Sequence, residues 1–167
     1  PHISPLDNVL LFLKNNLYDR ILVNYMENKK TKILVIDDNE IIRMMFSNIF
    51  WLHGLDDAYE LNTVARVDEA LKHIDDSSSC PDIIFMGLVM PFEKGGKVTP
   101  SVDAGFTIIK HIKETPELSR IRIIVLSGYH DAEFQQMALD MGVERYLKKS
   151  ENMPQDILEQ IRSLRQS

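Results

Sequence analysis

Residues 32–39 read KILVIDDN, and this stretch decides the fold. Residues 33–36 form a continuous apolar run, which is typical of a parallel β-strand covered by helices on both faces. The acidic pair Asp37 and Asp38 follows the run directly, and Asp38 or Asn39 is suited to cap the helical pattern that comes next. A buried strand that ends in polar residues and leads into a helix predicts the first unit of an α/β sheet.

Short apolar runs alternate with helical periods along the rest of the chain. We expect four further strands, at residues 59–64, 82–86, 121–126 and 145–147. The spacing of apolar residues predicts five helices, at residues 39–50, 67–74, 104–114, 132–141 and from Pro154 onward. Five strands interleaved with five helices predict a parallel sheet with helices on both sides.

Composition excludes several classes of protein. The chain has 167 residues, of which 44% are hydrophobic and 26% are charged, as expected for a globular protein with one main core. Its formal net charge of −6 argues against a nucleic-acid binder, and its one cysteine, Cys80, excludes an internal disulfide and a cysteine-based zinc site. With neither a membrane-spanning run nor a signal peptide in view, we expect a cytoplasmic protein that does not enter a membrane.

Polar residues follow three of the expected strands at the point where each strand ends, and a glycine follows a fourth. Asp37 and Asp38 follow the first strand, Gly87 the third, Ser127 the fourth, and Lys149 comes just after the fifth. Ligands bind at the carboxyl ends of the strands in open α/β sheets, so we expect these residues to share one crevice. Two carboxylates suit Mg²⁺, and a hydroxyl with an ammonium suits the oxygens of a phosphoryl group. The alternative is that the acidic pair only caps the first helix.

Four stretches carry a resemblance to a known family. They are KILVIDDN (32–39), PDIIFMGLVMP (81–91), IIVLSGY (123–129) and GVERYLKKS (142–150). In order and spacing they resemble the response-regulator receiver domain of two-component signalling, over residues 31–167. The resemblance implies a flavodoxin-like, doubly wound, five-stranded parallel sheet with strand order 2-1-3-4-5 and helices on both faces.

The resemblance also implies a metal site. Asp37 and Asp38 match the acidic pair that positions Mg²⁺ in the family. Val89 matches the residue whose backbone carbonyl completes that site.

Three further residues match the family's phosphoryl-binding and switch positions. Ser127 matches the hydroxyl that moves toward the phosphoryl group, and Tyr146 matches the aromatic residue whose rotamer follows that movement. Lys149 matches the lysine that pairs with the acceptor and then with its phosphate.

The chain departs from the family at Gly87, where receivers carry the phosphoacceptor aspartate. Glycine has no side chain, so we expect that no acyl phosphate forms there and that Mg²⁺ binding is weak or absent. Two interpretations remain open: a pseudo-receiver that works by binding partners, or an ordinary receiver whose acceptor has been substituted or lost. In either case we expect Lys149, which lacks its usual partner, to form an ion pair with Asp37 or Asp38.

The resemblance implies protein partners rather than catalysis. These are a sensor histidine kinase or phosphotransfer protein and a downstream effector, the latter bound around Tyr129, Tyr146 and Met153. No enzymatic activity is expected. A flavodoxin-like flavin carrier shares the architecture, but the acidic pair Asp37 and Asp38 would repel the flavin phosphate.

Two segments lie outside the family pattern. We expect residues 1–30 to form an N-terminal helical extension, because apolar residues recur at helical spacing at Leu6, Leu10, Leu13, Leu17 and Ile21. This stripe can pair two chains as a homodimer or pack on the chain's own domain. Residues 87–103 are expected to be a loop, and its part from 92 to 103 is an insertion that either contacts a partner or is merely tolerated.

Overall fold

A computed structural model describes residues 30–128, 131–152 and 154–165, and those from Thr31 onward belong to a compact unit that spans Thr31–Ser167. The expectations for residues 1–29, including the apolar stripe and the homodimer through it, lie outside the described residues. The same is true of Tyr129 and Met153 in the expected effector surface.

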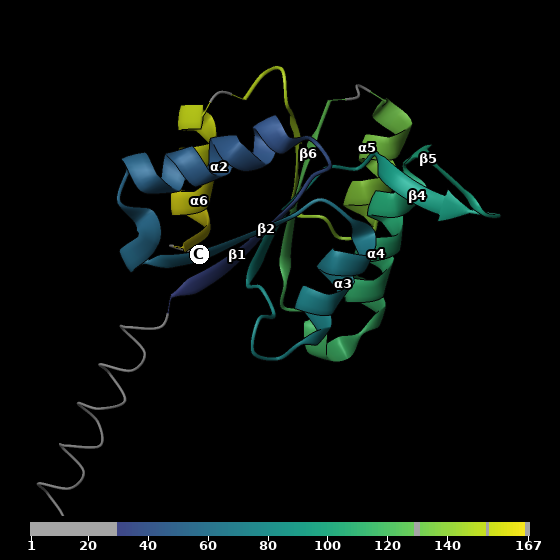
Figure 1. Cartoon of the computed structure of the whole chain (residues 1–167), viewed down its shortest axis with the longest axis horizontal. Helices are drawn as coiled ribbons and strands as arrows, with labels where there is room; N and C mark the ends of the chain where they lie inside the picture. Colours follow the sequence, from purple (N-terminus) through teal and green to yellow (C-terminus); the bar gives the residue numbers. More distant parts are fainter. Residues whose placement is uncertain (1–29, 129–130, 153, 166–167) are drawn as a thin grey trace, which may run out of the picture. The chain divides into compact units, whose positions relative to one another are not determined.

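A single parallel sheet of five strands forms the centre of this unit (Figure 1). Its order is β2-β1-β3-β6-β7, which confirms the expected order once the strands are counted within the sheet. The strands are β1 (Thr31–Ile36), β2 (Tyr59–Val64), β3 (Ile83–Met86), β6 (Arg122–Ser127) and β7 (Arg145–Lys148). The four further predicted strands match these bounds to within one residue at each end, and β1 begins two residues before the apolar run.

Helices cover both faces of the sheet (Figure 1). One face carries α2 (Glu40–Leu52) and α6 (Pro154–Arg165), and the other carries α3 (Val67–Asp75), α4 (Asp103–Glu114) and α5 (Ala132–Asp140). Two short 3₁₀ helices, η1 (Leu55–Asp57) and η2 (Pro116–Leu118), join helices to strands. The doubly wound fold is therefore confirmed.

Two apolar cores result from the alternation of side chains along each strand. Ile33 and Val35 of β1 pack with Phe46 and Phe50 of α2, while the intervening β1 residues pack toward α3 and α4. All four residues of the run that opened the sequence argument are at most 1% exposed. A strand buried on both faces explains why this run is continuously apolar.

Residues 87–103 are not a loop, as the sequence analysis expected, because they contain a β-hairpin. β4 (Met90–Lys94) and β5 (Lys97–Ser101) pair antiparallel around Gly95 and Gly96, whose φ angles of 62° and 76° form a two-residue turn. Pro91 lies opposite Pro100 in the register, and this two-stranded sheet consists only of edge strands, where proline is tolerated. The Gly-Gly pair is typical of a hairpin turn, but prolines argue against strands on either side of it, so the hairpin was not predicted.

Local capping follows the sequence. Asn39 caps α2, since its side-chain oxygen accepts a hydrogen bond from the Ile41 N–H at 2.9 Å. Gly142 follows α5 with a φ of 88°, the left-handed conformation that glycine adopts without strain after a helix. Within the described ranges, no helix has the length and apolar character needed to cross a membrane.

Candidate functional site

Backbone hydrogen bonds continue past the strand ends and align the polar residues that follow. The Asp37 N–H donates to the Val64 carbonyl at 3.1 Å, and the Gly87 N–H donates to the Ile36 carbonyl at 2.8 Å. The Lys149 N–H donates to the Ser127 carbonyl at 2.8 Å. Residues that are far apart in the chain are thus held side by side at the carboxyl edge of the sheet, where parallel α/β folds bind ligands.

A crevice with a volume of about 270 Å³ opens at this edge. It contains most of the residues that the sequence singled out, together with neighbours from the hairpin and the loops. Its lining residues are Asp38, Asn39, Gly87, Leu88, Val89, Pro100, Leu126, Ser127, Gly128 and Lys149. Tyr146 is a predicted site residue that is not among these lining residues; it lies in β7 and packs against the core that α3, α4 and α5 cover.

Asp37 is the buried anchor of the crevice. It is 1% exposed, and its Oδ2 lies 2.6 Å from the Lys149 Nζ, while its Oδ1 accepts a hydrogen bond from the Asn39 N–H at 3.0 Å. The Arg43 guanidinium donates to the Asp37 backbone carbonyl at 2.6 Å. The predicted ion pair of Lys149 is confirmed, and Asp37 is the partner rather than Asp38. A buried carboxylate is stable only when it is paired and hydrogen-bonded in this way.

Gly87 lies directly beside this ion pair. A Cβ atom at position 87 would lie 3.1 Å from Asp37 Oδ2 and 3.5 Å from Asp37 Cγ. A side chain at this position therefore fits only if the Asp37 carboxylate moves by a few tenths of an ångström. The space next to the Gly87 backbone is used by the carboxylate of Asp37.

Gly105 shapes the crevice from a second direction, and the sequence analysis did not single it out. Its N–H donates to the Leu88 carbonyl at 3.1 Å, and a Cβ atom there would lie only 2.6 Å from that oxygen and 2.9 Å from the Leu88 Cα. The first turn of α4 can approach the residues after β3 this closely because position 105 is glycine. A glycine in the first turn of a helix was the available signal.

Pro100 is the second residue that the sequence analysis missed. It lies on β5 and lines the crevice, so the inserted hairpin contributes to the wall of the site. Because residues 92–103 were expected to be a loop, nothing in the sequence analysis related this proline to Gly87.

The oxygen atoms available to a metal ion are few. Asp38 is exposed and lines the crevice, and so does Val89, whose backbone carbonyl the resemblance assigns to the metal site, but one oxygen of Asp37 is engaged by Lys149. Mg²⁺ is commonly held by one or two carboxylates and several waters. Asp38, the second oxygen of Asp37 and the Val89 carbonyl therefore provide only the minimum number of ligands for the ion. No group of three or more His, Cys, Asp or Glu side chains suited to a metal occurs in the described part of the chain.

Comparison with known sequences places these observations in a family. The family model described as the response regulator receiver domain matches residues 33–162. The polar-differentiation response regulator DivK of Brucella anthropi is 24% identical over 125 residues, which are 75% of this chain and 89% of that protein. Hybrid signal transduction histidine kinase A of Dictyostelium discoideum is 28% identical over 120 residues, which are 72% of this chain but only 5% of the kinase.

Solved structures resemble this chain over most of its length. The phosphorylated cyanobacterial phytochrome response regulator RcpA has a TM-score of 0.63 and 26% identity, over 80% of this chain and 91% of that one. The chemotaxis response regulator CheY4 of Vibrio cholerae has the same TM-score and 24% identity, over 81% of this chain and 98% of that one. The likeness to CheY4 supports the fold alone.

Proposed function

The chain belongs to the response regulator receiver domain family, and from this premise we propose that it signals through protein contacts without accepting a phosphoryl group at position 87. Receiver domains of two-component systems interact with histidine kinases, phosphotransfer proteins and effectors. In the proposed role the chain binds these kinds of partner but does not become phosphorylated at position 87. The whole-protein activities of the hybrid kinases are not part of the proposal, since this chain spans 5% to 7% of their length.

The absence of a side chain at Gly87 is the chemical basis of the proposal. An acyl phosphate needs a carboxylate oxygen that can attack phosphorus, and glycine offers none. Asp37 is a poor substitute because Lys149 and the Asn39 N–H engage both of its oxygens. Asp82 precedes β3 at its opposite end, more than ~10 Å away at about 3.3 Å per residue.

The ion pair between Asp37 and Lys149 is the observation that carries the proposal. In our interpretation of the crevice, Lys149 would pair with an aspartate at position 87 if one were present. Its ammonium instead lies 2.6 Å from Asp37 Oδ2, which itself occupies the space beside Gly87. The charge of the buried Asp37 carboxylate is thereby balanced in the absence of an acceptor, so this form can be stable without phosphate.

Mg²⁺ is the metal that receiver domains bind, and we propose that this chain binds it weakly. Asp37, Asp38 and the Val89 carbonyl are the groups that would hold it. A bound Mg²⁺ would supply positive charge for phosphoryl oxygens. Lys149 competes for Asp37, and the carboxylate that would come from position 87 is lacking, so affinity is expected to be lower than in a variant that carries aspartate there.

Labelling with a small acyl phosphate tests the proposal. We expect no stable incorporation of ³²P from labelled acetyl phosphate and Mg²⁺ into the chain as given. In Gly87→Asp we expect incorporation, together with tighter Mg²⁺ binding measured by calorimetry. Gly87→Asn is the matched control, because it places a side chain of the same size beside Asp37 without a nucleophilic carboxylate.

Two outcomes would contradict the proposal. Stable label in the unmodified chain would mean that another group accepts the phosphoryl, and peptide mapping would identify it. Equal labelling of Gly87→Asp and Gly87→Asn would mean that any new label is independent of the carboxylate. Circular dichroism of each variant establishes that the fold is retained.

A further inference from the structure

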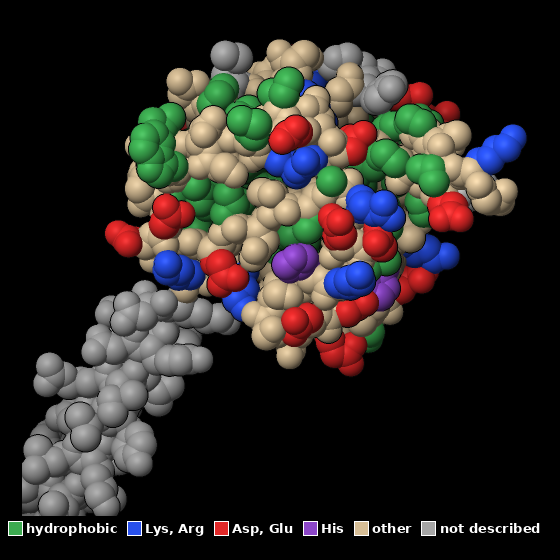
Figure 2. Space-filling view, viewed as in Figure 1, with side chains coloured by type: hydrophobic (Ala, Val, Ile, Leu, Met, Phe, Trp, Pro, Cys, Tyr) green, Lys and Arg blue, Asp and Glu red, His purple; other side chains and the backbone are tan. Residues whose placement is uncertain are grey.

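The outer side of α2 is the most exposed apolar surface of the described residues. Four large side chains on this helix are more than half exposed: Ile41 at 74%, Met44 at 56%, Trp51 at 76% and Leu52 at 67%. Figure 2 shows hydrophobic side chains gathered over α2. Single exposed apolar residues are ordinary, but several on one short helix indicate an interaction site. We call this surface the α2 face, defined by these four residues and the groove described next.

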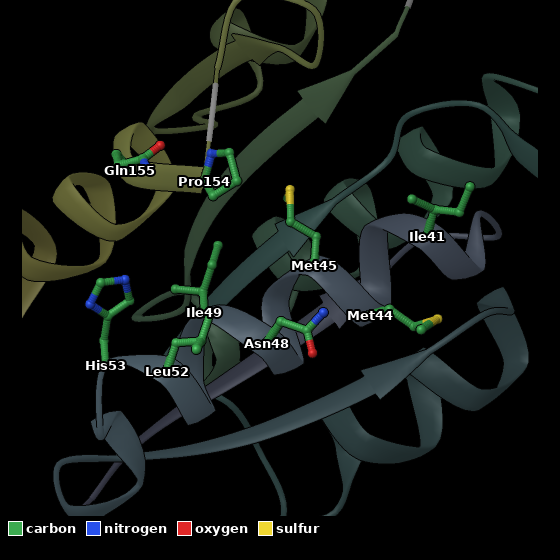
Figure 3. A pocket seen from close by; sticks show the side chains of 9 residues that line it. All are labelled: Ile41, Met44, Met45, Asn48, Ile49, Leu52, His53, Pro154 and Gln155. Atoms are coloured by element: carbon green, nitrogen blue, oxygen red, sulfur yellow. The ribbon is translucent and has the colours of Figure 1, made fainter.

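A groove runs along the α2 face beside the beginning of α6. Its volume is about 500 Å³, and Figure 3 shows side chains of Met45 and Ile49 extending from α2 toward Pro154. The full lining is Ile41, Met44, Met45, Asn48, Ile49, Leu52, His53, Pro154 and Gln155. Ile41 and Leu52 both protrude from the surface and line the groove. The same surface therefore has both protruding side chains and a groove, and packed helices place the side chains of one in the grooves of the other.

Charge limits which partner fits this groove. None of its nine lining residues is Asp, Glu, Lys or Arg, although 26% of the chain is charged. The two charged residues of α2 itself, Glu40 and Arg43, lie in its first four residues and have opposite signs. A strongly charged partner would find no ion pair to form here. Two copies of a chain with net charge −6 repel one another over an acidic surface, but not across this uncharged one.

The exposed apolar area of the α2 face also favours a second copy of this chain as the partner. An aromatic side chain buries roughly 150–250 Å², and on that scale four large side chains that are 56–76% exposed present together at most roughly 400–700 Å². One partner of a stable dimer buries about 800 Å², with an apolar centre and a polar rim. The α2 face has the size of such a centre, and polar groups such as Asn48 and Gln155 lie along it.

We propose that the α2 face binds the α2 face of a second copy of this chain, with the two α2 helices antiparallel across a two-fold axis. In such an isologous contact, a knob of each copy enters the groove of the other. Asn48 lies midway between Met44 and Leu52 along the helix, four residues from each, so it lies near the axis and close to its own symmetry mate. This dimer is independent of phosphoryl chemistry at position 87.

Sedimentation of the full chain tests the dimer. We expect the mass to rise with concentration from 19.3 kDa toward twice that value. Met44→Glu buries a carboxylate in the contact, and we expect the dimer dissociation constant to rise by about 30-fold or more. Met137→Glu is the matched control, since Met137 is also half exposed on a helix, at 43%, but lies on α5 across the sheet. It should leave dimerisation unchanged.

Two further variants separate this face from other routes to a dimer. Leu13→Glu places a charge in the N-terminal apolar stripe and should leave dimerisation unchanged. Asn48→Cys should form a disulfide-linked dimer under mild oxidation, whereas Gln136→Cys on α5 should not, and the native Cys80 is buried. A chain that remains monomeric at every concentration overturns the proposal. So does a dimer that Leu13→Glu or Met137→Glu dissociates and Met44→Glu does not.

Discussion

The crevice and the α2 face lie close to each other but are built in opposite ways. In the crevice, a buried charge is paired: Asp37 is 1% exposed, and its carboxylate lies 2.6 Å from the half-buried Lys149 ammonium. On the α2 face, apolar groups are exposed, and Ile41 and Trp51 are about three-quarters accessible to solvent. Each surface therefore carries the type of residue that folding alone would not put there.

The contrast shows which interactions belong to the fold and which are available to a partner. The buried pair is complete within the chain, so its loss should be felt as lost stability. The exposed apolar side chains contribute little to folding, so their loss should be felt in association. Variants in the crevice should therefore change the free energy of unfolding, and variants on the α2 face should change association.

The largest effect within the crevice is expected from breaking the buried pair. Asp37→Ala leaves the Lys149 ammonium, 23% exposed, without its carboxylate, and removes the acceptor of the Asn39 N–H. Losing one partner of a fully buried pair costs 3–5 kcal/mol, and the partial exposure of Lys149 reduces this to about 2–3 kcal/mol. Urea unfolding measures the loss.

Asp38→Ala is the control for the buried pair. Asp38 is exposed, so its removal should change the free energy of unfolding by no more than about 0.5 kcal/mol. Equal losses in the two variants would mean that the crevice is stabilised by its total charge rather than by the specific pair, and the contrast with the α2 face would weaken.

Much of this crevice could be predicted from the sequence because its residues follow strands. A continuous apolar run fixes where β1 ends, and the parallel order then brings Asp37, Gly87 and Lys149 to one edge. Even the ion pair of Lys149 could be predicted, because an ammonium group that lacks its usual partner is stabilised by the nearest carboxylate. The choice of Asp37 over Asp38 could not, since it depends on which of two adjacent side chains points inward at the end of β1.

The close contacts that two glycines make at the crevice could not be predicted from the sequence. Substitutions at Gly105 and Gly87 test how tight these contacts are. Gly105→Ala would place a Cβ 2.6 Å from the Leu88 carbonyl oxygen, a backbone atom that cannot move without displacing α4. We expect a loss of about 1–3 kcal/mol, as for other overpacked sites. Differential scanning calorimetry, which records the drop in Tm, measures it.

Gly87→Ala is the comparison for Gly105→Ala. The nearest atom to its Cβ would be the side-chain oxygen of Asp37, at 3.1 Å, and the nearest backbone atom would be the Ile36 carbonyl oxygen, at an ordinary 3.8 Å. Alanine also recovers about 0.5–1 kcal/mol relative to glycine. These terms oppose each other, so the net change should stay within about 1 kcal/mol. A larger loss at Gly87 than at Gly105 would show that the Asp37 carboxylate is held more rigidly than the backbone of α4.

The α2 face was missed because helical periodicity identifies the buried stripe and not the exposed remainder. The apolar residues that recur at helical spacing in this segment are Ile42, Met45, Phe46, Ile49 and Phe50. The last three are at most 3% exposed, and the first two are half-buried. The same sequence has further apolar residues between them, and periodicity gives no reason for their presence. An apolar residue off the stripe of an amphipathic helix is the signal that could have located this face.

The smallest effect is expected on the α2 face itself. Ile41→Ala removes a side chain that is 74% exposed and replaces it with a better helix former, so the free energy of unfolding should change by no more than about 0.5 kcal/mol. Ile49→Ala, on the same helix at 3% exposure, should cost about 2–5 kcal/mol. Both are measured by urea unfolding at low protein concentration, because a dimer would add concentration-dependent stability. If Ile41→Ala costs as much as Ile49→Ala under these conditions, Ile41 is part of the folded core and the α2 face is not free to bind a partner.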